Sequence, residues 1–307
     1  MTQYARLSAD HDPAGDGPAR LAGLPGGGRA RFAVRRGEHE PWVPLASLGL
    51  NPADTPELIS VSAEAAARLA AGQGTPVPGS GPLRCPVVRP GKMIAIGLNY
   101  MDHIRETGAT RPDRPIAFAK YPSSLNDPSG DLIVDPGLTA QPDYEAELAV
   151  IIGSPAYQVS RSAALGVVFG YAVANDVSAR DLQRAESQFS RSKSMDTFCP
   201  VGPWITTADQ VPDPQALAIE CQVNDEIRQK SMTAEMIFPV AELIAHLSRT
   251  MTLLPGDVIL TGTPHGVGLG RKPPAFLAEG DLVRVRISGL GSISNKVARP
   301  ARLAGPS

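Results

Sequence analysis

Alternating and periodic apolar positions divide this chain into many short predicted strands and a few helices. Val283, Val285 and Ile287 alternate with arginines, which is typical of a half-buried strand. Apolar residues also recur with helical spacing over residues 240–247, which predicts an amphipathic helix. Further strands are expected at 31–37, 42–45, 93–97, 167–174, 217–223 and 258–260, and further helices at 56–71 and 99–106. Strands that outnumber helices in this way predict a β-rich α+β fold.

A stretch rich in glycine and proline separates two parts of the chain. Residues 72–82, which include Pro76, Pro78 and Gly79, have the composition of a linker. We therefore expect a small N-terminal accessory domain over residues 1–82 and a larger domain over residues 83–307. Within the smaller part, residues 10–30 are rich in Gly, Pro, Ala and Asp and are predicted to form a flexible loop.

Composition and charge limit the partners of the protein. The formal net charge of the 307 residues is -2, which predicts neither nucleic-acid nor acidic-membrane binding. No apolar run approaches the ~20 residues that span a bilayer, and no secretion signal opens the chain. The three cysteines, Cys85, Cys199 and Cys221, lack the spacing of metal ligands. These features together predict a cytoplasmic protein.

Two glutamates open an otherwise apolar run and are separated by one residue. On a strand, Glu145 and Glu147 would share one face, with Cβ atoms roughly 6.5–7 Å apart, whereas on a helix they would not face each other. We expect the opposite face of this half-buried strand to belong to the core. Two carboxylates side by side repel each other and are costly to desolvate, and a divalent cation would reverse both penalties. The core face would consist of Ala146, Leu148, Val150 and Ile152.

Asp176 follows another predicted strand and can complete a three-carboxylate metal site. The alternative is that it only begins a turn or a helix. His103 and Glu106 are three residues apart, so on a helix they would form a pair able to activate a water molecule. A surface salt bridge is the alternative for this pair, and Asn99 is the predicted cap of that helix.

Other polar residues offer weaker signals. Lys193, in a polar loop, can steady a carboxylate or an enolate, or it can simply be solvated. Arg180 and Gln183 can face the same cavity or the solvent. The glycine-rich run 261–270 lacks the lysine of a phosphate loop. We expect its backbone N–H groups and the Thr263 hydroxyl to bind an anion. His265 has no partner that the sequence reveals.

Five stretches, in this order, resemble the fumarylacetoacetate hydrolase family. The similarity extends from about Lys92 to Val297, which is about two-thirds of the chain. Each stretch is modest alone, but their joint order is specific. The five stretches are residues 97–106, 143–153, 170–183, 192–203 and 257–268.

This resemblance implies a mixed β-roll fold, a homodimer, and a divalent cofactor, which is Mg²⁺ with Mn²⁺ or Ca²⁺ as alternatives. It implies that His103 and Glu106 form a catalytic dyad on a lid segment, and that Lys193 contacts substrate near the metal. The founding type of hydrolase has an additional aspartate ligand where this chain has Asn99, so a fourth carboxylate is not carried over. By the same resemblance, the metal ligands are Glu145, Glu147 and Asp176, and the substrate-binding residues are Arg180, Gln183 and Thr263.

The resemblance implies chemistry on small keto acids. Our first expectation is a metal-dependent hydrolase that cleaves a C–C bond of an acylpyruvate or related 1,3-diketo acid through an enolate. The same enolate also serves a decarboxylase of an oxaloacetate-like substrate, or a keto–enol or double-bond isomerase of aromatic catabolism, and fold does not choose between them. The non-enzymatic alternative is a dimer that binds a keto acid or a metal without turnover.

Overall fold

The computed structural model describes residues 2–7, 32–36, 39–77 and 82–300. The loop predicted over residues 10–30 lies outside the described residues, as do residues 78–81 of the predicted linker. None of the helices in the described ranges has the length and apolar character needed to cross a membrane.

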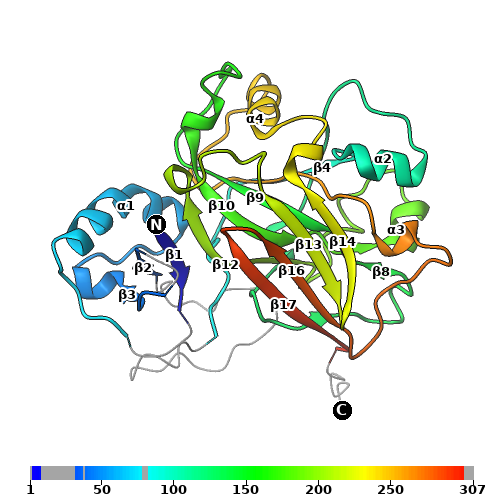
Figure 1. Ribbon diagram of the computed structural model, residues 1–307, viewed down its shortest axis with the longest axis horizontal. Coiled ribbons are helices and arrows are strands. Elements are labelled where there is room, and N and C mark those ends of the chain that lie inside the picture. The colour runs from blue at the N-terminus through cyan, green and yellow to red at the C-terminus, as the bar shows by residue number, and fades with distance from the viewer. Residues whose placement is uncertain (1, 8–31, 37–38, 78–81, 301–307) are drawn as a thin grey trace, which may run out of the picture.

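A ten-stranded mixed sheet forms the centre of the molecule (Figure 1). Most neighbouring strands are antiparallel, but β15 runs parallel to β4. The strand β6 (Leu125–Asn126) pairs with β12 beside the main path. The path follows the order β3 (Val43–Pro44), β2 (Phe32–Arg35), β1 (Gln3–Arg6), β12 (Cys199–Thr207), β10 (Val168–Asn175), β9 (Ala146–Ile152), β15 (Val258–Leu260), β4 (Met93–Gly97) and β5 (Ile116–Ala119).

A five-stranded sheet packs against the large sheet and lies in front of β9 and β10 in Figure 1. On its strand β16, the predicted alternation of buried and exposed residues is confirmed. Apolar side chains from both sheets fill the space between them. The order is β14 (Glu226–Met232), β13 (Ala218–Val223), β16 (Leu282–Ile287), β17 (Gly291–Ala298) and β7 (Leu132–Ile133), and a separate pair joins β11 (Ser178–Ala179) to β8 (Pro142–Asp143).

The strand β9 is buried on both faces, so the prediction of a half-buried strand is wrong. Leu148 and Val150 belong to the core between the sheets, as expected. Ala149 and Ile151, on the other face, belong to a second core with residues of β4, β12 and β15. The strand lies near the middle of the large sheet, where apolar residues cover both faces. Glu145 and Glu147 therefore lie on the side of the large sheet that faces the second core. Neither face of β9 contacts solvent.

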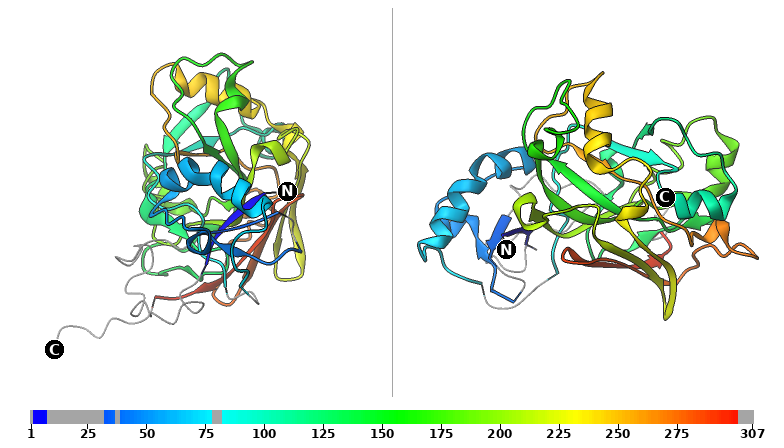
Figure 2. Two further views of the ribbon diagram at one scale, coloured as in Figure 1. Left: turned by 90° about the vertical axis from the view of Figure 1, so that its left-hand side faces the viewer. Right: turned by 45° about the horizontal axis from the view of Figure 1, so that its top comes forward.

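Four α-helices of the described ranges border the sheets, and the predicted α+β class is confirmed. The amphipathic helix expected at 240–247 is α4, and the segment expected at 56–71 is α1 (Figures 1 and 2). The bounds are α1 (Thr55–Ala70), α2 (Met101–Thr107), α3 (Arg180–Ala185) and α4 (Val240–Ser248).

The N-terminal strands join the large sheet. Tyr4 of β1 pairs with Ile205 of β12, and α1 packs on β2 and β3 at one end of the molecule (Figure 2). The guanidinium of Arg35 lies 4.3 Å from the ring centroids of both Trp42 and Trp204, so it links the N-terminal segment to β12. The division into domains at residue 82 stays a prediction, although the sheet itself continues across it.

Candidate active site

Antiparallel pairing of β9 with β10 brings three acidic residues together. The register joins Ala174 to Glu147, so Asp176 comes next to Glu145, and its main-chain N–H donates to the Glu145 carbonyl at 2.9 Å. One carboxylate oxygen from each residue lies within 4.8 Å of the others, and all three residues are buried. We call Glu145, Glu147 and Asp176 the carboxylate triad.

The donor set of the triad suits a divalent cation. Burial, then Asp176 and Glu145, raise the pKa of Glu147 well above its usual value, since a third negative charge is unfavourable there. Oε2 of Glu147 accepts the Gly262 N–H at 2.9 Å. Hard cations such as Mg²⁺ and Mn²⁺ prefer oxygen ligands. The triad can therefore hold a divalent metal, as these three residues were predicted to do.

Two lysines contact the triad directly. Lys193, which is 4% exposed, donates from Nζ to Oδ2 of Asp176 at 2.9 Å and also to Oε2 of Glu145. Lys193 is buried against carboxylates of the chain, so the solvated alternative is wrong, while its contact with a substrate stays a prediction. Lys120 lies 2.8 Å from Oδ1 of Asp176, and sequence reasoning missed it. A lysine after a short apolar strand is ordinarily solvated, so no pattern distinguishes it.

Arg180 supports the triad from the other side. It donates from Nε to Asp143 at 2.8 Å and from Nη1 to Gln183 at 2.9 Å, and its Nη2 lies 2.6 Å from Oε1 of Glu145. Burial opposes the ionised form of Glu145, but Lys193 and Arg180 outweigh it and lower the pKa of Glu145 to about 2. In this structure Arg180 and Gln183 bond to each other, and Arg180 binds chain carboxylates.

Sequence reasoning also missed Asp143, although it continues the pattern of acidic residues at every second position. Its Oδ2 accepts from Arg180, and both oxygens accept main-chain N–H groups, from Gly268 at 2.7 Å and Leu269 at 3.0 Å. Asp143 is fully buried. The alternation of residues 143, 145 and 147 is the signal that could have revealed it.

The helix α2 begins differently from the prediction. Tyr100 is the residue before its first turn, and no side chain caps the helix. Asn99 is not the cap, because its side chain donates to the Thr261 carbonyl at 2.7 Å and accepts from the Phe238 N–H at 2.9 Å. Asn99 thus joins the loop before α2 to two other segments, which occupies the groups that a cap would use.

His103 and Glu106 form the predicted pair on one face of α2. Nδ1 of His103 lies 3.1 Å from Oε2 of Glu106. His103 is only 8% exposed, so the alternative of a surface salt bridge is wrong. After Lys193 and Arg180, His103 is a further group that lowers the pKa of Glu145, which puts its imidazole within electrostatic range of the triad. The pair can therefore take or give a proton beside the metal-binding carboxylates.

A second histidine–carboxylate pair holds α2 to the glycine-rich loop 261–270. Nδ1 of His265 lies 3.0 Å from Oδ2 of Asp102, and the His265 N–H donates to Oδ1 at 3.2 Å. The Ser231 hydroxyl donates to the same carboxylate. The side chain of His265 is 45% exposed, in contrast to that of His103 at 11%. The His265–Asp102 pair attaches α2 to the loop 261–270 and lies nearer the surface than His103.

The loop 261–270 binds anions, but those shown by the structure are carboxylates of the chain itself. The Gly266 N–H donates to Oε1 of Glu106 at 2.8 Å. Gly266 has a φ of +96°, and a Cβ there would lie 2.0 Å from the Arg228 carbonyl oxygen, so only glycine fits. The Thr263 hydroxyl accepts from Gln229 Nε2 at 2.9 Å. Together, N–H groups of this loop fix Glu147, Asp102, Glu106 and Asp143.

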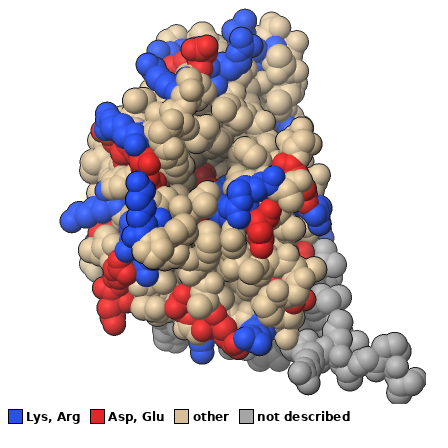
Figure 3. All heavy atoms as spheres, turned by 90° about the vertical axis from the view of Figure 1, so that its right-hand side faces the viewer, with Lys and Arg blue, Asp and Glu red and all other residues tan. Residues whose placement is uncertain are grey.

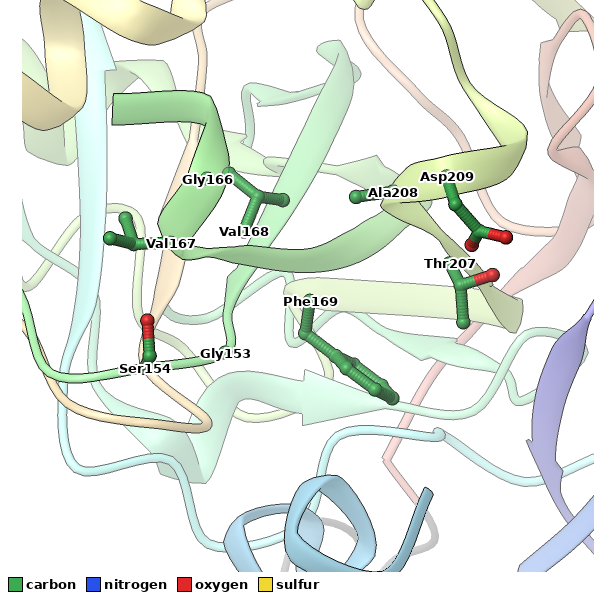
Figure 4. A pocket seen from close by; sticks show the side chains of 9 residues that line it. All are labelled: Gly153, Ser154, Gly166, Val167, Val168, Phe169, Thr207, Ala208 and Asp209. Carbon is green, nitrogen blue, oxygen red and sulfur yellow. The ribbon is translucent and has the colours of Figure 1, made fainter. Parts of the chain in front are cut away.

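One face of the molecule carries α2 and α3 (Figure 1). Figure 3 shows this face hollowed near its middle, with acidic atoms deep in the hollow and Lys and Arg side chains around it. A separate cavity of about 360 Å³ lies elsewhere and is lined by residues 153–154, 166–169 and 207–209 (Figure 4). Its lining contains one carboxylate, Asp209, and no cationic side chain, so it does not suit an anionic keto acid.

Comparison with known proteins agrees with this arrangement. A family model described as fumarylacetoacetate (FAA) hydrolase C-terminal matches residues 92–298, which include the triad, α2 and the loop 261–270. The chain belongs to the fumarylacetoacetate hydrolase family. The predicted family and its fold are thereby confirmed, and the protein is an enzyme of that family.

Relatives in this family carry out different reactions. The chain is 47% identical over 213 residues to oxaloacetate tautomerase Fahd2a, a mitochondrial protein of Rattus norvegicus, which covers 69% of this chain and 68% of that protein. A fumarylacetoacetate hydrolase from Exiguobacterium antarcticum has a TM-score of 0.83 and 36% identity, over 98% of this chain and all of that one. Maleylpyruvate hydrolase from Sphingobium sp. SYK-6, solved with manganese(II) and pyruvate, has a TM-score of 0.74 and 31% identity, over 97% and 100% of the two chains.

Proposed function

We propose that the protein is a divalent-metal-dependent hydrolase that cleaves an acylpyruvate or a related 1,3-diketo acid. The observation that carries the proposal is the buried His103–Glu106 pair, because Glu106 and Glu147 of the triad accept N–H groups of the same loop 261–270. A cation that binds the triad would stabilise the negative charge of an enolate as a Lewis acid. The manganese and pyruvate in the maleylpyruvate hydrolase structure support a metal and a 2-keto acid for this family.

The charges of the site suit an anionic substrate. Asp143 and the carboxylate triad face three buried cations, which are Lys120, Lys193 and Arg180. A divalent ion would leave these groups with a net positive charge, which favours the carboxylate of a keto acid. Lys193, whose pKa Asp176 and Glu145 raise against the opposing effect of burial, stays protonated and supplies a positive charge next to a forming enolate.

His103 has the proton-transfer role in this proposal. Glu106 fixes the orientation of the imidazole through Nδ1, which leaves Nε2 to take a proton from water for attack on the distal carbonyl. The Gly266 N–H in turn fixes Glu106. We assign Thr263, Arg180 and Gln183 to the substrate side of the site, with Arg180 also orienting Glu145.

Keto–enol tautomerisation of an oxaloacetate-like acid is the second candidate, because the relative with 47% identity is named an oxaloacetate tautomerase. In that reaction His103 would move a proton at the carbon next to the keto group, without water attack. Decarboxylation of the same substrate uses the same enolate. A place in aromatic-compound catabolism is consistent with these substrates.

We further propose Mg²⁺ as the native ion, a homodimer as the assembly, and a cytoplasmic location. Mg²⁺ accords with a site built from three buried carboxylates, because it is a hard cation that takes oxygen ligands. The mitochondrial names of several relatives do not support the location, so it rests on the sequence argument alone.

The test is an assay of acylpyruvates, fumarylpyruvate and oxaloacetate with Mg²⁺, Mn²⁺ or excess chelator. C–C cleavage, CO₂ release and decay of the enol absorbance are measured separately. The proposal predicts metal-dependent cleavage of an acylpyruvate. Acceleration of enol decay alone would establish the second candidate, and no response of any substrate with either metal would contradict both.

A further inference from the structure

Gln229 is a buried glutamine whose amide joins three segments near the site. It lies on β14 and is 0% exposed. Its Oε1 accepts the main-chain N–H of Ala146 at 2.9 Å. Its Nε2 donates to the Thr263 hydroxyl and to the Pro264 carbonyl, each at 2.9 Å. A buried polar group is ordinarily hydrogen-bonded, and these three bonds use the amide oxygen and both hydrogens of the amide nitrogen.

The main-chain partners leave the amide of Gln229 one orientation. The oxygen and nitrogen of a glutamine amide are similar in shape, so the hydrogen-bond partners decide which position each atom takes. The Ala146 N–H can only donate and therefore faces the oxygen, while the Pro264 carbonyl can only accept and therefore faces the nitrogen. The group that faces the Thr263 hydroxyl is consequently the NH₂ of Gln229.

This orientation decides the role of the Thr263 hydroxyl. An amide NH₂ donates and does not accept, so the hydroxyl oxygen accepts from Gln229 and its own proton is left to be donated elsewhere. In the described part of the chain, no oxygen accepts that proton. Thr263 follows Gly262, whose N–H donates to Oε2 of Glu147 at 2.9 Å. The hydroxyl thus offers a proton one residue away from a group that is bonded to the carboxylate triad.

We propose that Gln229 is a positioning residue that fixes the Thr263 hydroxyl as a hydrogen-bond donor to the substrate. A donor at this place selects a carboxylate or keto oxygen, which can only accept, and hydrogen bonds to an ionised carboxylate are the stronger kind. The third bond of the amide holds Ala146 of β9, so the same side chain connects the strand of the triad to the loop 261–270. The inference rests on the proposed function, because it requires a keto acid at the triad with Thr263 on its substrate side.

The experiment is a double-mutant cycle of Gln229→Met and Thr263→Val in the full chain, assayed on the keto acid that the unaltered chain turns over fastest, with the activating metal at saturation. Methionine has a similar length but no donor, so the Thr263 hydroxyl can turn to the Pro264 carbonyl that Gln229 no longer holds. We expect KM to rise about tenfold in each single variant, the scale of one hydrogen bond to a charged group, with kcat little changed. KM in the double variant should equal that of Thr263→Val, because Gln229 acts through the hydroxyl. Gln229→Leu takes the place of Gln229→Met if the latter does not fold.

Gln215 provides the matched control. Its Oε1 accepts the Val240 N–H at 2.9 Å, and its Nε2 donates to the Thr233 carbonyl at 2.8 Å. Gln215→Met loses comparable bonds and should lower the melting temperature with no change in KM. An unchanged KM in Gln229→Met, or a KM in the double variant above that of Thr263→Val, would overturn this inference alone. Absence of turnover of any keto acid by the unaltered chain with Mg²⁺ or Mn²⁺ would overturn the proposed function as well.

Discussion

The carboxylate triad lies at the neighbouring ends of two long strands at the centre of the large sheet: Glu147 belongs to β9, Glu145 directly precedes it, and Asp176 directly follows β10. The His103–Glu106 pair, in contrast, lies on α2, a helix of seven residues. Ladder hydrogen bonds and two cores surround the triad residues, and lysine, arginine or main-chain donors contact their carboxylates. Side-chain contacts of Asp102 and Glu106 to the loop 261–270 fasten α2.

The difference indicates that the two regions have separate roles. Groups that bind a cation need fixed positions, which strands at the centre of a sheet provide. A group that transfers protons needs the right orientation when substrate is bound, and a short helix with few attachments can adjust. Variants of the triad should therefore abolish metal binding and catalysis together, while variants of α2 should affect catalysis and leave metal binding intact.

The largest effect is expected from Glu147→Gln. An amide retains the shape of the side chain but loses the charge that a hard cation requires. We expect Mg²⁺-dependent turnover to be lost in the substrate assay. Glu64→Gln, which changes an exposed residue of α1, is the control and should keep full activity. Retained Mg²⁺-dependent turnover in Glu147→Gln would contradict the assignment of Glu147 as a metal ligand.

His103→Ala should lower acylpyruvate hydrolysis by about 100-fold or more, the range of general-base catalysis. Mg²⁺ affinity, measured by calorimetry, should stay at the level of the unaltered protein, because His103 is not a triad member. His246→Ala on α4 is the matched histidine control. Equal hydrolysis rates in the two variants would mean that the pair on α2 has no part in the reaction.

The variant Arg180→Lys tests whether Arg180 orients Glu145 for metal binding or only binds the substrate. A lysine cannot reach Asp143, Glu145 and Gln183 at the same time, since only the guanidinium has the forked geometry. We expect Mg²⁺ affinity to fall about 10-fold, as for other outer-shell changes. A rise in KM with unchanged Mg²⁺ affinity would instead show that Arg180 serves the substrate alone.

The smallest effect is expected from Asp102→Asn. The change weakens the contacts to His265 and Ser231, each worth ~0.5–1.5 kcal/mol as a hydrogen bond. We expect kcat to fall about 2- to 10-fold on that energy scale, together with faster hydrogen exchange of the α2 amides. Arg105→Ala on the exposed side of the same helix is the control. Unchanged exchange in Asp102→Asn would show that this pair does not hold the helix.

Much of the fold and the triad followed from the sequence, for physical reasons. Apolar runs predicted β9 and β10, and alternate positions placed Glu145 and Glu147 on one side. The pattern predicted solvent on one face of β9 because sequence periodicity does not show what covers a strand from outside. A second core of residues distant in sequence provides that cover.

Contacts between distant segments account for what the sequence could not reveal. Lys120 and Lys193 are far apart in the chain and meet only because β5 and the loop after α3 converge on Asp176. Asp102 and His265 likewise become partners only in the fold. The sequence predicted that N–H groups of the loop 261–270 bind an anion, but it could not reveal that the anions in the structure are carboxylates of the chain, such as those of Glu106 and Glu147.

Mn²⁺ binding observed by anomalous diffraction tests the central claim most directly. Crystals of the unaltered chain and of Glu147→Gln are soaked in Mn²⁺, and data are collected near the manganese edge. The account predicts one strong peak per chain, bounded by single oxygens of Glu145, Glu147 and Asp176, and no peak there in Glu147→Gln. A peak elsewhere, or an equal peak in the variant, would contradict it.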